Sequence, residues 1–375
     1  MGLAITVLAA VRCSKNGTDN SISLSCEQPP FLSPGDKVAL ISPSYYTPME
    51  NVYGAADVIR EWGFEPIIGP NVGKTYHGKY AGTPKERVED IKWALRDTSI
   101  KAILCNRGGY GTISLVDLLP LEELKANPKW LIGFSDITTL HGMETRAGVM
   151  SIHGTMSSLI NKSEGLDVST SLVYDILTGT HPNYIVPSHP QNIAGKATGT
   201  LVGGNICTFV PVLGTDADAT KGEDIILFIE EVEESMHNID RLFNMLILNG
   251  VIDRCKGVIL GEFTDCSSDL EFGSVEEMLF SYLKDYKIPV CCGFPGGHDN
   301  VNLPLIMGSE VTLEVTPEQS RISFNIDGES EDMETADAIA ISKLSQEEIT
   351  EAVGEKQKRV IRAFNFIKYF EGKLR

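Results

Sequence analysis

An alternation of short apolar runs with amphipathic stretches, over residues 36 to about 180, restricts the fold of this chain more than any other feature. The run 36–42 (DKVALIS) is typical of a buried strand, and the stretch 49–62 that follows has apolar residues at helical spacing. Strands alternating with helices in this way predict a parallel, doubly wound α/β sheet. The other predicted strands are 64–68, 101–105, 130–132 and a run ending at 154, and the other predicted helices are 85–96, 113–119 and 137–143.

Near residue 190 the sequence pattern changes from alternating strands and helices to a strand-rich pattern, which predicts a second domain. A chain of 375 residues also exceeds the usual size of one core. Residues 181–198 are rich in Pro, His and Gln and are predicted as a linker. The segment 199–375 is predicted to form a smaller, β-rich C-terminal domain that ends in a helix over 345–374. Residues 1–30 are expected to be a poorly ordered leader, which leaves 31–180 as the N-terminal domain.

Composition narrows the classes of function. Net charge is −19, from 51 acidic and 32 basic residues, which argues against nucleic acid and anionic membranes as partners. The eight cysteines form no CxxC pair and no zinc-like spacing, so we expect a reducing, cytoplasmic setting without metal or cofactor. The apolar run 2–11 is short for a membrane span and lacks a basic flank, although an export signal there remains an alternative.

Ser135 follows the predicted strand 130–132 in the sequence Gly133-Phe134-Ser135-Asp136 and precedes a predicted helix. A serine at a sharp strand-to-helix turn is the arrangement of a hydrolase nucleophile, but the second glycine of the usual elbow pattern is missing. On local sequence alone, a helix N-cap is therefore the favoured interpretation of Ser135. Sites of doubly wound sheets lie at the carboxyl ends of the strands. That edge should also carry the loop after residue 42, the glycine turn 106–112 and the segment 153–154.

Two further residues have the chemistry that a serine nucleophile needs. Glu230 ends the apolar run 226–229, and His298 lies in the glycine-rich loop after another apolar run. A serine requires a base to take its proton, and the base requires an acceptor that orients it and stabilises its charged form. Ser135, His298 and Glu230, each at the end of a predicted strand, supply these three roles.

Taken in order and spacing, the motifs of this chain resemble those of the LD-carboxypeptidases, a family of serine peptidases. The resemblance covers nearly all of the chain from Pro34 onward. It rests on GDKVALISPS (35–44), NRGGYGT (106–112), GFSDIT (133–138), SIHG (151–154), GTLVGGN (199–205), ILFIEEVEE (226–234) with NIDRLF (238–243), GVILGEF (257–263) and GFPGGHDNVNLPL (293–305).

The resemblance implies a flavodoxin-like N-terminal domain and a β-rich C-terminal domain. It implies Ser135 as nucleophile, His298 as base and Glu230, rather than Glu231, as the acid of the triad. The backbone N–H of Asp136 and one from the 108–109 glycine turn would form the oxyanion hole. Gly109 is our choice of donor from that turn, with Gly108 as the alternative.

Other candidate residues have a structural interpretation beside the functional one. Arg107, Gly108, Tyr110 and His153 are candidate substrate contacts, but Arg107 could equally form an ion pair and His153 could equally be a packing residue. His141 is expected to be a satisfied or exposed helix histidine. The remaining carboxylates of the acidic run are predicted to be a solvated face, namely Glu231, Glu233 and Glu234. Cys105 and Cys207 are poor nucleophile candidates because no histidine motif accompanies either.

The resulting hypothesis is a metal-independent serine carboxypeptidase, expected as a homodimer. Its substrates would be murein tetrapeptides, cleaved at the L-D amide before the terminal D-alanine during peptidoglycan recycling. A first alternative within the same superfamily is an immunity peptidase that cleaves microcin C-type aminoacyl-nucleotide toxins. Such proteins tend to have asparagine where this chain has Gly111, which favours the murein substrate. A second alternative is a binding module without catalysis, in which Ser135 only caps a helix.

Overall fold

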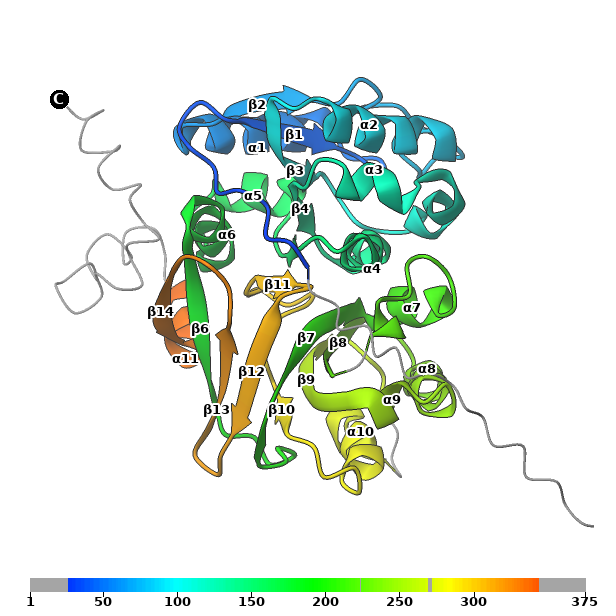
Figure 1. Cartoon of the computed structure of the whole chain (residues 1–375), viewed down its shortest axis with the longest axis vertical. Coiled ribbons are helices and arrows are strands. Elements are labelled where there is room, and N and C mark those ends of the chain that lie inside the picture. The colour runs from blue at the N-terminus through cyan, green and yellow to red at the C-terminus, as the bar shows by residue number, and fades with distance from the viewer. Residues whose placement is uncertain (1–25, 223, 269–271, 344–375) are drawn as a thin grey trace, which may run out of the picture.

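The computed structural model describes residues 26–222, 224–268 and 272–343 (Figure 1). The predicted tail helix 345–374 and most of the predicted leader lie outside these residues. The predicted leader, residues 1–30, extends too far, because residues 26–30 pack against the body of the protein. Cys26 is buried, Glu27 pairs with Val149, and the carbonyl of Pro30 accepts a hydrogen bond from the Trp130 ring at 3.1 Å.

The first sheet has the strand order β2-β1-β3-β4-β5-β11. Its first five strands are parallel and follow the flavodoxin-like order, which confirms the predicted doubly wound fold. The bounds are β1 Lys37–Ile41, β2 Glu65–Ile68, β3 Ile100–Cys105, β4 Trp130–Gly133, β5 Ser151–His153 and β11 Leu305–Met307.

Helices cover both faces of this sheet because alternate strand residues bury their side chains on opposite sides. Val38 and Leu40 pack in the same apolar cluster as α1, α5 and α6, whereas Ala39 and Ile41 pack with α2, α3 and α4. The bounds are α1 Met49–Glu61, α2 Pro84–Arg96, α3 Leu121–Lys125, α4 Thr138–Ala147, α5 Ser157–Ser163 and α6 Val168–Thr178. The segment predicted as a helix over 113–119 is a 3₁₀ helix, Thr112–Leu118.

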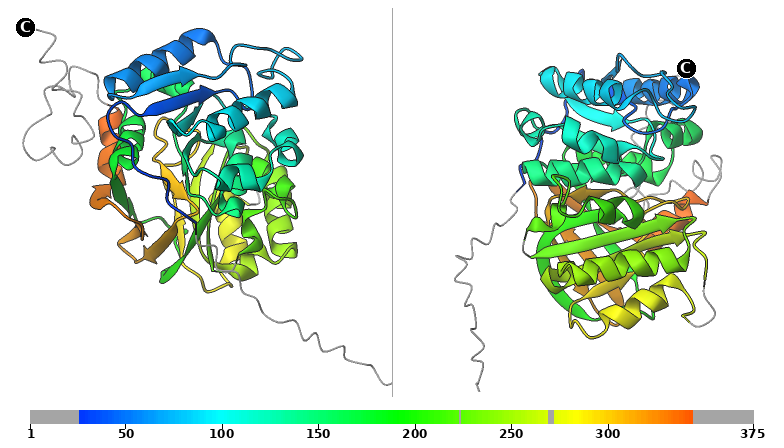
Figure 2. Two further views of the ribbon diagram at one scale, coloured as in Figure 1. Left: turned by 45° about the horizontal axis from the view of Figure 1, so that its top comes forward. Right: turned by 90° about the vertical axis from the view of Figure 1, so that its right-hand side faces the viewer.

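The second sheet is mixed and has eight strands in the order β10-β9-β8-β7-β12-β13-β6-β14. Its strands β7 to β10 are parallel, with α8 and α10 packed against them, and the remainder is mainly antiparallel (Figure 2). The strands are β6 Thr180–Pro187, β7 Gly195–Asn205, β8 Ile225–Val232, β9 Cys255–Thr264, β10 Val290–Cys292, β12 Glu310–Val315, β13 Gln319–Phe324 and β14 Glu329–Glu334. The helices are α7 Ile206–Phe209, α8 Met236–Leu248, α9 Val251–Arg254, α10 Val275–Leu283 and α11 Thr335–Ser342.

The segment 181–198 differs from the predicted linker. Most of it belongs to β6 and to the start of β7, and β6 pairs with both β13 and β14. Its proline and histidine content suggested a loop, but long-range pairing with strands much later in the chain determines its conformation.

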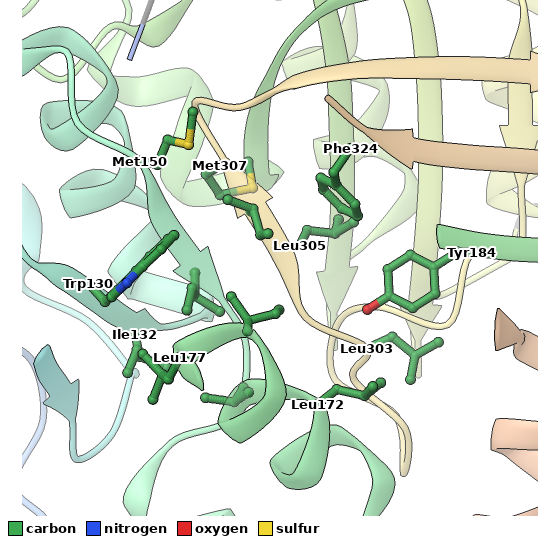
Figure 3. Close-up of a cluster of buried hydrophobic side chains, with 14 of the residues drawn as sticks. Trp130, Ile132, Met150, Leu172, Leu177, Tyr184, Leu303, Leu305, Met307 and Phe324 are labelled. Atoms are coloured by element: carbon green, nitrogen blue, oxygen red, sulfur yellow. The ribbon is translucent and has the colours of Figure 1, made fainter. Parts of the chain in front are cut away.

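The two sheets share one apolar core. The strand β11 lies after the whole parallel region of the second sheet, yet it pairs antiparallel with β5 of the first sheet. Figure 3 shows side chains of β4 and α6 beside side chains of β6, β11 and β13. The two predicted domains are therefore packed together, and the end of β4 faces the second sheet across their junction (Figure 1).

No helix within the described residues is both long and apolar enough to cross a membrane.

Candidate active site

Ser135 occupies a strained turn at the carboxyl end of β4. Its φ is +63°, in the left-handed region that residues other than glycine rarely adopt. Such strain costs of order 1–3 kcal/mol and persists at sites where the surrounding structure holds it. The 3₁₀ turn that begins at Ser135 has Phe134 as its N-cap and no side-chain capping bond. The alternative that Ser135 caps a helix therefore finds no support in this geometry.

The glycine turn after β3 lies directly against Ser135. A Cβ atom placed on Gly108 would lie 2.9 Å from the Ser135 Cβ and 3.1 Å from its Oγ. Gly109 has a φ of +115° and packs on Tyr45. The N–H groups of Gly108 and Gly109 have no hydrogen-bond acceptor within the described part of the chain. They are therefore available as donors beside the serine.

Asp136 joins the turn that carries Ser135 to two neighbouring loops by hydrogen bonds. Its buried carboxylate accepts hydrogen bonds from Ser44 Oγ at 2.6 Å and from the Thr112 N–H at 2.9 Å. Its backbone carbonyl accepts a third, from Thr112 Oγ1 at 2.6 Å. The loops after β1, β3 and β4 are thus joined by one residue. Neither Ser44 nor Thr112 was predicted as a site residue, although both lie within the motifs that mark the sheet edge.

His298 and Glu230 form a hydrogen-bonded pair. His298 Nδ1 lies 2.7 Å from Glu230 Oε2, and the Glu230 side chain is fully buried. Gly297 permits this approach, because a Cβ there would lie 2.8 Å from Glu230 Oε2 and its φ is +136°. On the other side, the His298 ring packs against the ring of Phe134, 4.9 Å between centroids, and Phe134 directly precedes Ser135. Glu230 and His298 are thus in direct contact, and Phe134 places the His298 ring beside the turn that carries Ser135.

The pair shifts the pKa of both partners. Burial raises the pKa of Glu230, and the hydrogen bond and charge of His298 oppose this only in part. Burial by itself would lower the pKa of His298, but the hydrogen bond to Glu230 and the charges of Glu230, Glu231 and Glu233 outweigh it and raise the pKa. An imidazole held in this way is a stronger base than a free one.

Glu231 is buried, which corrects the prediction that it belongs to a solvated acidic face. Its carboxylate accepts hydrogen bonds from Asn205 Nδ2 at 2.7 Å and from the Cys207 N–H at 2.9 Å. The pairing of β8 with β9 is irregular between Ile229 and Glu231, and this irregularity allows two consecutive carboxylates to be buried. Glu230 is the one that contacts His298, as the resemblance implied.

The two other histidines near the site are buried. His141 is satisfied, with Ser151 Oγ at 2.8 Å from Nδ1 and the Gly133 carbonyl at 2.8 Å from Nε2. Burial lowers the pKa of His141 to about 4, so its ring is neutral and supports the strand that carries Ser135. His153 is fully buried between the rings of Phe134 and Phe228, which supports the packing interpretation of this residue.

Arg107 and Tyr110 are exposed on the glycine turn, where a substrate could reach them. Tyr110 is 54% exposed and lies 6.3 Å from Tyr80, between ring centroids. A hollow of about 250 Å³ lies beside it, with the buried Arg87 in its wall. Arg87 donates to the carbonyls of Pro43 and Gly111, so it fixes the same loops that Asp136 joins.

A larger cleft of about 880 Å³ extends from His298 along the junction. Its walls come from α5 and the start of α6, the end of β9, the loop after β10, and α11. Concave sites of this size accommodate small peptides and other small molecules. The residues of this cleft other than His298 were not predicted as site residues. The motif GFPGGHDNVNLPL contained several of them, but nothing in the sequence indicated which faced the cleft.

Comparison with known proteins identifies the family. The LD-carboxypeptidase N-terminal domain matches residues 38–154, and the LD-carboxypeptidase C-terminal domain matches residues 198–313. The chain belongs to the LD-carboxypeptidase family. Both members of the proposed pair, Glu230 and His298, lie in the C-terminal match, and Ser135 lies in the N-terminal match.

Individual relatives agree with this membership. A Synechocystis protein named as a carboxypeptidase is 34% identical over 293 residues, covering 76% of this chain and 94% of the relative. The murein tetrapeptide carboxypeptidase of Pseudomonas aeruginosa is 28% identical, covering 74% and 93%. The microcin C7 self-immunity protein MccF of Escherichia coli is 28% identical, covering 76% and 92%. The structure of a muramoyltetrapeptide carboxypeptidase from Oxalobacter formigenes shares the fold, with a TM-score of 0.71, 24% identity, and coverage of 78% and 99%.

Proposed function

We propose that this LD-carboxypeptidase family member is a serine enzyme that removes the terminal D-alanine from murein tetrapeptides by cleaving the L-D amide. The observation that carries the proposal is the 2.7 Å contact between His298 Nδ1 and the buried Glu230 carboxylate, beside a serine held in a left-handed turn. The name of the Pseudomonas relative supports the choice of substrate.

In the proposed mechanism, His298 Nε2 takes the proton of the Ser135 hydroxyl while Oγ attacks the carbonyl carbon of the third residue. Glu230 holds Nδ1 and stabilises the imidazolium that forms. The backbone N–H of Asp136 and that of Gly109, with Gly108 adjacent, would stabilise the oxyanion, an effect worth about 3–4 kcal/mol per donor. The imidazolium then protonates the leaving D-alanine nitrogen. Water, deprotonated by His298, hydrolyses the acyl-enzyme and releases the tripeptide.

The test compares the wild type with Ser135→Ala on a murein tetrapeptide, with products followed by mass spectrometry. We expect loss of one alanine by the wild type, unaffected by chelator, and a rate roughly 10⁴-fold lower or more in the variant. Ser330→Ala, at an exposed serine far along the chain in β14, is the matched control and should act like the wild type.

A microcin-type aminoacyl-nucleotide is the second substrate in this test, because MccF is also a relative. Cleavage of the nucleotide alone would refute the murein proposal and favour an immunity peptidase. Binding of either compound without turnover would favour the non-catalytic module.

We expect the enzyme in the cytoplasm, since all seven cysteines of the described residues are free thiols. We also expect it to be a homodimer, which light scattering would measure.

A further inference from the structure

Arg87 of α2 is a buried cation without a direct carboxylate partner. Its side chain is 2% exposed, and within the described residues no acidic side chain forms an ion pair with it. Nη1 donates to the carbonyl of Pro43 at 2.7 Å and to that of Gly111 at 3.0 Å. Nη2 donates to Ser114 Oγ at 3.0 Å, and the guanidinium carbon lies 5.6 Å from the centroid of the Tyr80 ring. A buried charge is unfavourable unless its surroundings compensate it, so these contacts hold Arg87 in one position.

The opposite charge that compensates Arg87 belongs to Asp136, and a peptide group lies between the two. The carbonyl of Gly111 and the N–H of Thr112 are the two ends of this group. Arg87 donates to its carbonyl, and its N–H donates to the Asp136 carboxylate at 2.9 Å. Burial lowers the pKa of Arg87, and the charge of Asp136 opposes this shift. Hydrogen bonds in such a chain polarise and strengthen one another.

A second path joins the same two charges through the loop after β1. Arg87 donates to the carbonyl of Pro43, and the hydroxyl of the next residue, Ser44, donates to the same carboxylate at 2.6 Å. Tyr45 follows, and its ring packs on Gly109, where an added Cβ would lie 2.3 Å from the ring. A displacement of this loop would therefore move the wall behind the glycine turn.

Both paths end at the groups proposed to stabilise the oxyanion, which are the backbone N–H of Asp136 and that of Gly109. Such donors must lie within about 3 Å of the developing charge. Gly109 and Gly111 have φ values of +115° and +130°, and glycine adopts many other conformations as readily. The glycine turn therefore cannot fix its own N–H groups, and hydrogen bonds from Arg87 and Asp136 must do so.

We propose that Arg87 is a positioning residue, which forms with Asp136 a peptide-bridged charge pair that holds the oxyanion hole in its reactive geometry. Arg87 affects the rate through the backbone N–H groups of the turn. Its planar guanidinium suits this role, because donors in a fixed fork can meet two carbonyls and a hydroxyl at once. The inference rests on the acyl-enzyme mechanism of the proposed function.

The test measures release of D-alanine from the murein tetrapeptide by the wild type, Arg87→Ala and Arg87→Lys. Arg96→Ala is the matched control, since Arg96 lies in the same helix and its exposed side chain pairs with Glu123 at the surface. Thermal unfolding checks that each variant is folded. Each assay is repeated with methylguanidinium, below the concentration that unfolds the protein. The hollow of about 250 Å³ that has Arg87 in its wall gives this cation a path to the vacated position.

We expect Arg87→Ala to lower kcat about 10²-fold, the loss that a shift of about 1 Å in a reacting group causes, while KM stays within about threefold. Arg87→Lys should lose about tenfold, because a single ammonium group cannot replace both terminal nitrogens of the guanidinium. Methylguanidinium should raise kcat of Arg87→Ala about tenfold or more and leave the wild type and Arg96→Ala unchanged.

A folded Arg87→Ala variant with the wild-type kcat would overturn the inference and leave the proposed function intact. So would a loss confined to KM, or a loss of kcat that methylguanidinium leaves unchanged. If Arg87→Ala does not fold, Arg87→Lys decides: a lower kcat at unchanged KM supports the inference, and a wild-type kcat overturns it. No release of D-alanine by the wild type would overturn both the inference and the proposed function.

Discussion

The contact between Gly108 and Ser135 leads to a quantitative prediction for Gly108→Ala. The new Cβ would lie 2.9 Å from the Ser135 Cβ, whereas carbon atoms in contact prefer about 3.5–4.0 Å. Rotation of the serine hydroxyl cannot relieve a contact with Cβ, so the turn must shift by several tenths of an ångström up to about 1 Å. Gly108 does not have a left-handed φ, so alanine itself introduces no backbone strain there.

A displacement of about 1 Å costs roughly 10²-fold in rate when it moves a reacting group. We therefore expect kcat/KM for D-alanine release to fall about 10²-fold in Gly108→Ala, equivalent to about 2.7 kcal/mol of transition-state stabilisation. Overpacking of this kind destabilises a fold by about 1–3 kcal/mol, so thermal unfolding must show that the variant stays folded at the assay temperature.

Gly195→Ala is the matched control, because the nearest atoms to its Cβ would belong to Pro289 at an ordinary contact distance of 3.4 Å, and it lies in the second sheet. It should keep wild-type activity. A folded Gly108→Ala variant within twofold of the wild type would refute the argument that this approach positions the serine. An equal loss in Gly195→Ala would attribute the effect to general destabilisation.

Three other predictions follow from the same geometry. Activity requires neutral His298, whose pKa is raised, so the acid limb of the kcat/KM profile should have its midpoint above pH 6.5. Glu230→Gln removes the interaction that raises this pKa, so it should move the acid limb to lower pH and lower the rate about 10²- to 10⁴-fold. An acid limb that does not move in Glu230→Gln would argue against the pairing of the two residues. Thr112→Val deletes the hydrogen bond to the Asp136 carbonyl and should reduce the free energy of unfolding by about 1–3 kcal/mol in urea titrations, whereas Thr112→Ser should retain most of it. The pKa of His141 falls from 6.5 to about 4 on folding, so as the pH is lowered the unfolded chain binds a proton at this residue before the folded protein does. The free energy of unfolding should therefore drop by about 2 kcal/mol between pH 7 and pH 5. The same dependence of stability on pH in His141→Gln would contradict this assignment.

Local sequence was sufficient for the parts of the fold that depend on nearby residues. The alternation of apolar runs and amphipathic stretches predicted β1 to β5 and the helices α1, α2 and α4, because a strand buried on both faces leaves a continuous apolar run and a helix buried on one face leaves a periodic pattern. The position of Ser135, Glu230 and His298 near the carboxyl ends of β4, β8 and β10 followed from the same pattern. The family motifs then supplied their roles, which remain predictions.

Local sequence was insufficient where distant segments determine the conformation. The segment 181–198 has a loop-like composition, yet it forms β6 because β13 and β14 pair with it. Leu305–Met307 lies between strands of the second sheet in sequence, but it completes the first sheet beside β5. Neither pairing could be read from the residues themselves, since their partners lie far away along the chain.

The tertiary structure also decided the environment of the polar residues. Sequence placed a serine, a glutamate and a histidine near the carboxyl ends of strands, although Glu230 lies inside β8 and His298 lies in the loop after β10. Only the packing of the two sheets buried Glu230 and Glu231 on opposite sides of an irregular strand and occupied the Asp136 carboxylate with Ser44 and Thr112. Burial and hydrogen bonding set the pKa and the orientation of such groups, and both arise from residues that are neighbours in space but not in sequence.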